Sequence, residues 1–269
     1  MKALNQKYKR ALVTGSSAGI GLALSKMLLN EGVAVIGMSR QPDRAIDDSR
    51  YHPVPFDLSD TSGLPNKMNA ILKAFPDIDL IINNAGFGIV NRLEEADPEE
   101  VLEQYAVMLE APTLIAGLAI RHFKKRGIGC LLNISSLASE IPIPLMPVYN
   151  ASKAGLSALS DSLMLDAEGD HACYSVIDVR PGDFKTEFAS RMKGEADWNG
   201  VDLRAILDRH HAEAPEVSSV INPILKALYD GKNRRLRVGT FFQTVVGSLG
   251  ARVLPGSIGR WLIRDYYKK

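Results

Sequence analysis

A repeated order of elements constrains the fold of this chain more than any other feature. Short apolar runs rich in β-branched residues alternate with longer stretches in which apolar residues recur at helical spacing. Strands that alternate with helices form parallel βαβ units, and their right-handed crossovers wind into an open sheet with helices on both faces. We therefore predict an α/β fold, a Rossmann-like doubly wound parallel sheet in three layers (α/β/α).

The pattern places the elements along the chain as follows. The expected strands are Arg10–Thr14, Val33–Ser39, His52–Phe56, Leu80–Asn83, Gly129–Ser135 and Cys173–Val179. The expected helices are Gly19–Asn30, Leu64–Phe75, Glu99–Lys125 and Val148–Ala167. No linker interrupts residues 1–230, so we predict a single dinucleotide-binding domain over residues 1–269. Residues 183–215 are polar and irregular in pattern, which indicates a substrate lid.

Composition and charge exclude several classes of protein. Hydrophobic residues make up 46% of the 269, enough to bury a core, and the net charge of +1 does not indicate a nucleic-acid partner. Cys130 and Cys173 lie in apolar stretches, so we expect no disulfide framework. The N-terminus lacks a signal-peptide core, and no uninterrupted apolar run approaches the roughly 20 residues of a membrane span. We therefore expect a soluble, cytoplasmic protein.

A glycine-rich turn, Thr14–Gly21, lies directly between the first strand and the first helix. Small residues there let backbone N–H groups approach a pyrophosphate, and the helix N-terminus adds partial positive charge. A side chain at Gly15, Gly19 or Gly21 would keep the phosphates away or separate the helix from the strand. The turn predicts a dinucleotide site.

The end of the second strand indicates which dinucleotide is bound. An acidic residue about 20 positions after the glycines binds a ribose 2′-hydroxyl, whereas a nearby Arg accommodates a 2′-phosphate. Here Ser39 stands where the acid is expected, and Arg40 follows it. The sequence favours NADP(H) over NAD(H), with a solvated surface Arg as the alternative explanation for Arg40.

Tyr149 and Lys153 lie four residues apart at the start of a predicted helix, so both side chains share one face. A phenol has a pKa near ~10, and we expect the neighbouring ammonium to lower the pKa of Tyr149, which would make it a general acid or base. A serine hydroxyl can donate to a carbonyl oxygen as negative charge develops on it. Such a pair taken alone is also common on protein surfaces.

The ordered motifs of this chain resemble the classical short-chain dehydrogenase/reductase family. They are Thr14–Gly21 (TGxxxGxG), Asn83–Gly86 (NNAG), Asn133–Ser136, Tyr149 with Lys153, and Arg180–Thr186 (PGxxxT). The family's serine precedes its tyrosine by about 13 positions, which selects Ser136 over Ser135. By resemblance, Ser136, Tyr149 and Lys153 are the catalytic residues, and hydride passes between nicotinamide C4 and a carbonyl carbon while Tyr149 transfers the proton.

The resemblance also implies cofactor contacts and an assembly. The expected contacts are Gly15, Ser17, Gly19, Ile20, Gly21, Ser39, Arg40, Asp57, Leu58, Asn84, Ala85, Gly86, Tyr149, Lys153, Pro181, Gly182 and Thr186. The substrate is expected to be a small ketone or alcohol. It should be fairly apolar, because Ile141–Pro147 lies between Ser136 and Tyr149. Members commonly pair their two long helices across subunits, which implies a homodimer or homotetramer.

Two positions depart from the family pattern. Met108 aligns with an Asn that usually anchors a water of the proton relay, and Met cannot replace its hydrogen bonds. Ala18 stands where many NADP-dependent members carry a basic residue. Met108 motivates an alternative function, a low-turnover NADP(H) sensor or scaffold. An extended-type epimerase or dehydratase is a third hypothesis, which the short chain and the glycine spacing disfavour.

The segment 232–269 combines basic and large apolar residues. The segment contains nine Lys and Arg residues, among them Arg260 and Arg264, and a single acidic residue, Asp265. Two interpretations stay open: contact with an anionic membrane surface, or a final strand and a C-terminal helix at a subunit interface. His210 and His211 are adjacent and lack companion ligands, so we predict no metal site.

Overall fold

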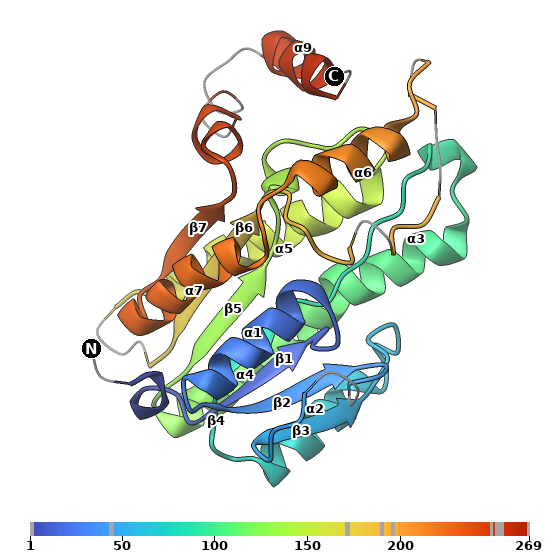
Figure 1. Ribbon diagram of the computed structural model, residues 1–269. Coiled ribbons are helices and arrows are strands. Elements are labelled where there is room, and N and C mark those ends of the chain that lie inside the picture. Colours follow the sequence, from blue (N-terminus) through green and yellow to red (C-terminus); the bar gives the residue numbers. More distant parts are fainter. Residues whose placement is uncertain are drawn as a thin grey trace.

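The computed structural model contains one parallel sheet of seven strands with helices on both faces (Figure 1). It describes residues 3–42, 46–169, 173–188, 191–194, 197–198, 200–247, 250 and 256–267. The strands are β1 (Arg10–Thr14), β2 (Ala34–Ser39), β3 (Tyr51–Pro55), β4 (Ile78–Asn83), β5 (Cys130–Ile134), β6 (Ser175–Pro181) and β7 (Arg234–Val238). Their order in the sheet is β3-β2-β1-β4-β5-β6-β7, which confirms the predicted Rossmann-like fold.

The helices form a layer on each side of the sheet (Figure 1). Helices α1 (Gly19–Asn30) and α7 (Ser218–Asp230) bury their apolar residues in one core with one side of the strands. Helices α2 (Leu64–Ala74) and α4 (Ala111–Arg126) pack in a second core on the opposite side, with α5 (Pro147–Asp166) beside α4. Strands β4 and β5 are buried along their whole length, as expected for parallel strands covered on both faces.

The predicted helix Glu99–Lys125 is interrupted by a π-helix. The structure has α3 (Pro98–Tyr105), a π-helical segment (Ala106–Glu110) and then α4. Pro112 in the first turn of α4 has no N–H to donate to the carbonyl four residues earlier, at Met108, and the wider turn accommodates that missing bond. Pro98–Arg126 is also apolar and long enough, by length and composition alone, to cross a membrane. Its face with Ile115 and Phe123 is buried in the core.

The predicted irregular lid is partly helical, so that part of the prediction was wrong. Helix α6 (Leu203–Glu213) lies within residues 183–215 and buries Leu203, Ile206 and Leu207. The Asp202 side chain accepts a hydrogen bond from the Ala205 N–H and begins the helix. The helix was not evident from the sequence, because the segment is mostly polar and only one narrow face of the helix is apolar.

The C-terminal segment contains a strand and further helices, as one of the two interpretations expected. Strand β7 pairs with β6 at the edge of the sheet. A π-helical segment (Phe242–Gly247) and α9 (Gly256–Tyr266) follow. Figure 1 shows α9 beyond the carboxyl ends of the strands, apart from the two helical layers. This edge of the sheet, where strand order reverses between β1 and β4, is where open α/β sheets bind ligands.

Candidate active site

The turn between β1 and α1 is built from glycines that no other residue can replace without strain. Gly15 and Gly19 have φ values of +67° and +53°, a backbone conformation that costs side-chain-bearing residues free energy. A Cβ on Gly21 would lie 2.3 Å from the Gly15 carbonyl oxygen. The Asn84 amide donates to the Thr14 carbonyl oxygen (2.9 Å), which fixes the turn against the end of β4.

A cavity of about 1190 Å³ opens along the carboxyl edge of the sheet. Its lining includes every predicted cofactor and catalytic residue except Gly21: Gly15, Ser17, Gly19, Ile20, Ser39, Arg40, Asp57, Leu58, Asn84, Ala85, Gly86, Ser136, Tyr149, Lys153, Pro181, Gly182 and Thr186. Gly21 packs behind the turn, where it lets α1 approach Gly15. Residues from seven separate segments thus meet at one site.

Lys153 is buried in the lining of this cavity. Its ammonium nitrogen donates to the Ile134 carbonyl oxygen (2.8 Å) and lies 5.9 Å from the centre of the Tyr149 ring. Burial lowers the pKa of Lys153 to about 8, and the negative charge of Asp178 opposes that shift. The helical spacing therefore places both side chains as predicted.

The pKa of Tyr149 differs from the expectation. Burial raises the pKa of Tyr149 to about 12, a hydrogen bond with Ser136 offsets part of this rise, and the charge of Asp183 adds to it. The prediction that Lys153 lowers this pKa was wrong for the protein alone, because the loss of water around the phenol dominates. At neutral pH the Tyr149 hydroxyl therefore keeps its proton and can donate it.

Ser136 is placed between the ends of β5 and β6. Its hydroxyl accepts a hydrogen bond from the Ala138 N–H (3.0 Å) and points toward the Pro181 carbonyl oxygen (3.5 Å). Backbone and side chain together hold the hydroxyl at the cavity wall, beside Tyr149. It is available to a carbonyl oxygen in the same cavity.

Met108 is buried beside the candidate catalytic residues. Its side chain is 1% exposed, and it borders Gly86 together with Lys153. A Cβ at Gly86 would lie 3.6 Å from both Met108 Cγ and Lys153 Nζ. Met108 and the Lys153 ammonium thus border the same glycine, and the Met108 thioether cannot donate a hydrogen bond.

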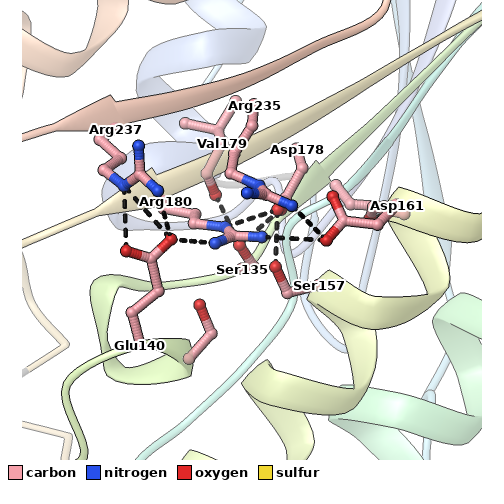
Figure 2. Close-up of polar contacts among 12 residues, drawn as sticks. Ser135, Glu140, Ser157, Asp161, Asp178, Val179, Arg180, Arg235 and Arg237 are labelled. Carbon is pink, nitrogen blue, oxygen red and sulfur yellow. Dashed lines mark hydrogen bonds and ion pairs between the residues drawn. The ribbon is translucent and has the colours of Figure 1, made fainter. Parts of the chain in front are cut away.

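A buried network of charges ties together the strand ends that carry the site (Figure 2). Arg180 in β6 pairs with Asp178 (2.7 Å), with Glu140 and with Asp161 (3.6 Å). Asp178 also accepts hydrogen bonds from Ser135 (2.5 Å) and Ser157 (2.7 Å). The network therefore links β5, β6 and α5, which present Ser136, Pro181 and Tyr149 respectively.

Two arginines of β7 complete this network (Figure 2). Arg237 donates to both carboxylate oxygens of Glu140, and Arg235 pairs with Asp161. Burial alone would raise the pKa of Glu140, but the hydrogen bond from Arg237 and the charges of Arg180 and Arg237 hold it below its usual value. Sequence patterns did not reveal the network. The available signal was the presence of two charged residues, Asp178 and Arg180, within the buried strand β6.

Replacement of Arg180 by Met is expected to destabilise the protein by about 3 kcal/mol, because it leaves Asp178 buried without its cation. Urea unfolding followed by circular dichroism measures this change. Arg234→Met is the matched control, since Arg234 forms a partly exposed pair with Asp230 whose removal costs less than about 1 kcal/mol. Equal stability of the two variants would contradict the role given to the network.

The apolar half of the cavity contains residues that sequence reasoning missed. Phe188 packs against Tyr149, with 5.7 Å between the ring centres. His211 of α6 and Gln243, Tyr266 and Tyr267 of the C-terminal segment also line the cavity. No local motif marks these residues, since the chain folds back from α6 and β7 to reach the site. The aromatic pair Tyr266-Tyr267 near the chain end was the available signal.

The comparisons with known proteins agree with this geometry. A family model described as short chain dehydrogenase matches residues 9–196. The chain belongs to the short-chain dehydrogenase/reductase family. Among its relatives is an uncharacterized oxidoreductase of Schizosaccharomyces pombe, 33% identical over 189 residues that cover 70% of this chain and 64% of that protein. The match thus spans less than two thirds of that relative's length.

Two further similarities bear on this short-chain dehydrogenase. An NADP-dependent (R)-specific alcohol dehydrogenase of Lentilactobacillus kefiri is 30% identical over 198 residues, which cover 70% of this chain and 78% of that protein. The crystal structure of a short-chain dehydrogenase from Streptomyces avermitilis has a TM-score of 0.77 and 25% identity, with 97% of this chain and 96% of that chain covered. The family resemblance predicted from the motifs is confirmed.

Proposed function

We propose that this protein is an NADP(H)-dependent carbonyl reductase or secondary-alcohol dehydrogenase. The observation that carries the proposal is that Ser136, Tyr149 and Lys153 line the same cavity as the glycine turn. A proton donor, a hydroxyl for the carbonyl oxygen and a dinucleotide cradle are the parts that such a reaction needs. The low-turnover sensor is not favoured, since these residues are present together and the relatives are named as oxidoreductases or dehydrogenases.

The residues present fit NADP(H). The Ser39 hydroxyl is buried and finds no hydrogen-bond partner in the part of the chain that the structure describes. It lines the cavity beside the exposed Arg40. A 2′-phosphate would satisfy this hydroxyl and pair with the guanidinium. The name of the Lentilactobacillus kefiri relative supports the same cofactor.

The proposed chemistry divides between the cofactor and the chain. When bound, the nicotinamide gives hydride to the carbonyl carbon or takes it from the alcohol. Ser136 donates a hydrogen bond to the carbonyl oxygen, and Tyr149 transfers its phenolic proton to that oxygen. Lys153 would hold the nicotinamide ribose, and it supplies positive charge near Tyr149. Burial raises the pKa of Tyr149 to about 12, so that its hydroxyl holds at neutral pH the proton that reduction of a ketone requires.

The proposed substrate is a fairly apolar ketone. The cavity beside Tyr149 is lined by apolar and aromatic side chains of the 141–147 loop, the lid and α9, namely Ile141, Ile143, Met146, Phe188, Met192, Leu207, Leu262, Ile263, Tyr266 and Tyr267. Apolar surface of this kind stabilises a bound ligand mainly by removing its apolar area from water.

The proposal is tested by NADPH oxidation with a panel of aliphatic, aromatic and ketoacyl substrates. We expect turnover that increases with the apolar surface of the ketone, and little turnover with sugar-nucleotide substrates. Binding of NADPH without oxidation by any ketone or aldehyde would contradict the proposed function.

Arg40→Ala is expected to weaken NADPH binding roughly 10–100-fold, because a charge-assisted hydrogen bond contributes about 1.5–3 kcal/mol. NADH lacks the 2′-phosphate, so its Kd should not change. Fluorescence titration of both cofactors measures the difference. Equal losses for NADPH and NADH, or no loss for either, would remove the argument for NADP(H).

The proposed assembly is a homo-oligomer through the two long helices. Leu102 of α3 and Leu165 of α5 are 68% and 69% exposed, large apolar side chains that a subunit interface would cover. The family resemblance implies the same pairing.

A further inference from the structure

Gln243 joins the C-terminal segment to the wall of the candidate active site. It lies in the π-helical segment Phe242–Gly247 that follows β7, and it lines the cavity. Its amide nitrogen donates to a carboxylate oxygen of Asp183 (2.8 Å), two residues beyond the end of β6. One side chain thus connects the segments that follow the two last strands of the sheet.

Two glycines leave room for the Gln243 amide. A Cβ on Gly182 would lie 2.4 Å from Gln243 Oε1, and a Cβ on Gly239 would lie 2.9 Å from the same atom. Both distances are shorter than van der Waals contact between a carbon and an oxygen, so another residue at either position would displace the amide. The ends of β6 and β7 therefore form a notch that this side chain fills.

The groups around this side chain match an amide. The Thr240 N–H can only donate, and Gln243 Oε1 accepts from it (3.3 Å). On the other side the Asp183 carboxylate accepts from the amide nitrogen. Burial and the charge of Asp183 raise the pKa of Tyr266 in α9, and a hydrogen bond with Gln243 offsets part of that rise. An amide offers one acceptor oxygen and two N–H donors, so Gln243 can serve all three neighbours at once.

The segment that Gln243 contacts lies at the proton-transfer end of the cavity. Gly182 and Asp183 line the cavity with Tyr149, and the charge of Asp183 adds to the rise that burial causes in the pKa of Tyr149. Tyr267, the neighbour of Tyr266, is only 7% exposed and packs in the same apolar cluster as Tyr149. The family resemblance implies that the nicotinamide borders Pro181 and Gly182.

We propose that Gln243 is a positioning residue for the nicotinamide: it fixes the Gly182–Asp183 backbone at the end of β6 and fastens Tyr266 of α9 beside it. This role rests on the proposed function, which supplies NADP(H) as the ligand. The glycine turn and Arg40 follow β1 and β2, and two further strands, β4 and β5, separate β1 from β6 in the sheet. Loss of Gln243 should therefore affect the nicotinamide half of the cofactor and spare the adenosine half.

The test compares two ligands by isothermal titration of the full-length protein. They are NADP⁺ and adenosine 2′,5′-bisphosphate, which carries the 2′-phosphate but no nicotinamide. Gln243→Ala is expected to weaken NADP⁺ binding roughly 10-fold, the lower end of what loss of a hydrogen bond to a charged group causes, and to leave the Kd of the bisphosphate unchanged.

Thr244→Val is the matched control. The Thr244 hydroxyl donates to the Thr240 carbonyl oxygen (2.9 Å) in the same segment, and Thr244 lies outside the described lining of the cavity. This variant should bind both ligands as the wild type does. Far-UV circular dichroism establishes that each variant is folded.

Gln243→Glu separates positioning from a loss of packing. The carboxylate has nearly the size of the amide but meets Asp183 with like charge. Two carboxylates in contact share a proton, and one pKa of the pair rises strongly. As the pH falls the pair takes up that proton, and the protonated carboxyl can again donate to its partner. Relative to wild type at the same pH, the Kd for NADP⁺ should be at least about 10-fold higher at pH 8 and within about 3-fold at pH 5.5.

The comparison with wild type at each pH accounts for other groups that titrate. These are the 2′-phosphate of the ligand and the described residues that interact electrostatically with Asp183, namely Tyr149, His210, Tyr266 and Tyr267. All of them are present in both proteins. A dependence on pH that appears only in Gln243→Glu therefore comes from the new carboxyl beside Asp183.

Three results would overturn the role of Gln243. They are wild-type affinity of Gln243→Ala for NADP⁺, equal losses of NADP⁺ and bisphosphate in that variant, and a loss in Gln243→Glu that does not change with pH. Absence of NADP⁺ binding by the wild type would remove the proposed cofactor and this role together. Tight NADP⁺ binding without reduction of any ketone would contradict the proposed function alone.

Discussion

Tyr149→Phe is expected to lower kcat for ketone reduction about 10²–10⁴-fold, the contribution typical of a positioned general acid. The phenyl ring keeps its contact with Phe188, so the cavity should keep its shape and NADPH should still bind. What the variant loses is the hydroxyl whose pKa burial raises to about 12 and which holds the transferable proton at neutral pH. Stopped-flow measurement of NADPH oxidation under saturating ketone gives the rate.

Tyr229→Phe is the matched control for this experiment. Its hydroxyl donates to Glu31 (2.5 Å) on the far side of the sheet, between α7 and α1. Its removal should change stability slightly and kcat not at all. A Tyr149→Phe variant that turns over at the wild-type rate would remove Tyr149 from the mechanism.

Gly21→Ala is expected to weaken binding of NADPH and NADH alike, roughly 100-fold. The new Cβ would lie 2.3 Å from the Gly15 carbonyl oxygen and 2.4 Å from the Asn84 amide, so α1 must move away from the turn that cradles the phosphates. Overpacking of this kind costs about 1–3 kcal/mol, and the upper end corresponds to the stated loss. Isothermal titration with both cofactors measures it.

Gly117→Ala tests whether the loss of cofactor binding expected for Gly21→Ala is specific to a glycine of the phosphate-binding turn. Gly117 lies on the exposed side of α4 with no atom within 4 Å of an added Cβ, and alanine should stabilise that helix by up to about 1 kcal/mol. Cofactor affinity should stay at the wild-type value in this variant. Normal cofactor binding by Gly21→Ala would show that close packing of α1 on the turn is unnecessary.

Local patterns were sufficient to predict the framework of the fold. The bounds of β1 and α1 follow from a short β-branched run and a glycine turn, and the structure has them at the predicted residues. The helical spacing of Tyr149 and Lys153 likewise placed both side chains in one cavity. Such features depend on neighbours in the sequence, and residue types alone therefore indicate them.

Features that arise from tertiary packing were not predictable in the same way. The pKa of Tyr149 depends on how completely the lid and α9 exclude water, which no local spacing reveals. The pairing of Arg180 with Glu140 and Asp161 joins residues about 20–40 positions apart.

The interruption of the long helix before Pro112, in contrast, could have been predicted from the sequence, because a proline within a helical pattern removes one backbone hydrogen bond.

The most direct test of the proposed function is a single-turnover experiment with an apolar ketone and NADPH that carries deuterium at both C4 positions. We expect wild-type protein to yield an alcohol with deuterium on the carbinol carbon, and Tyr149→Phe to bind the same NADPH but to form this alcohol about 10²–10⁴-fold more slowly. An alcohol without deuterium, or no alcohol from any ketone while NADPH is bound, would contradict it.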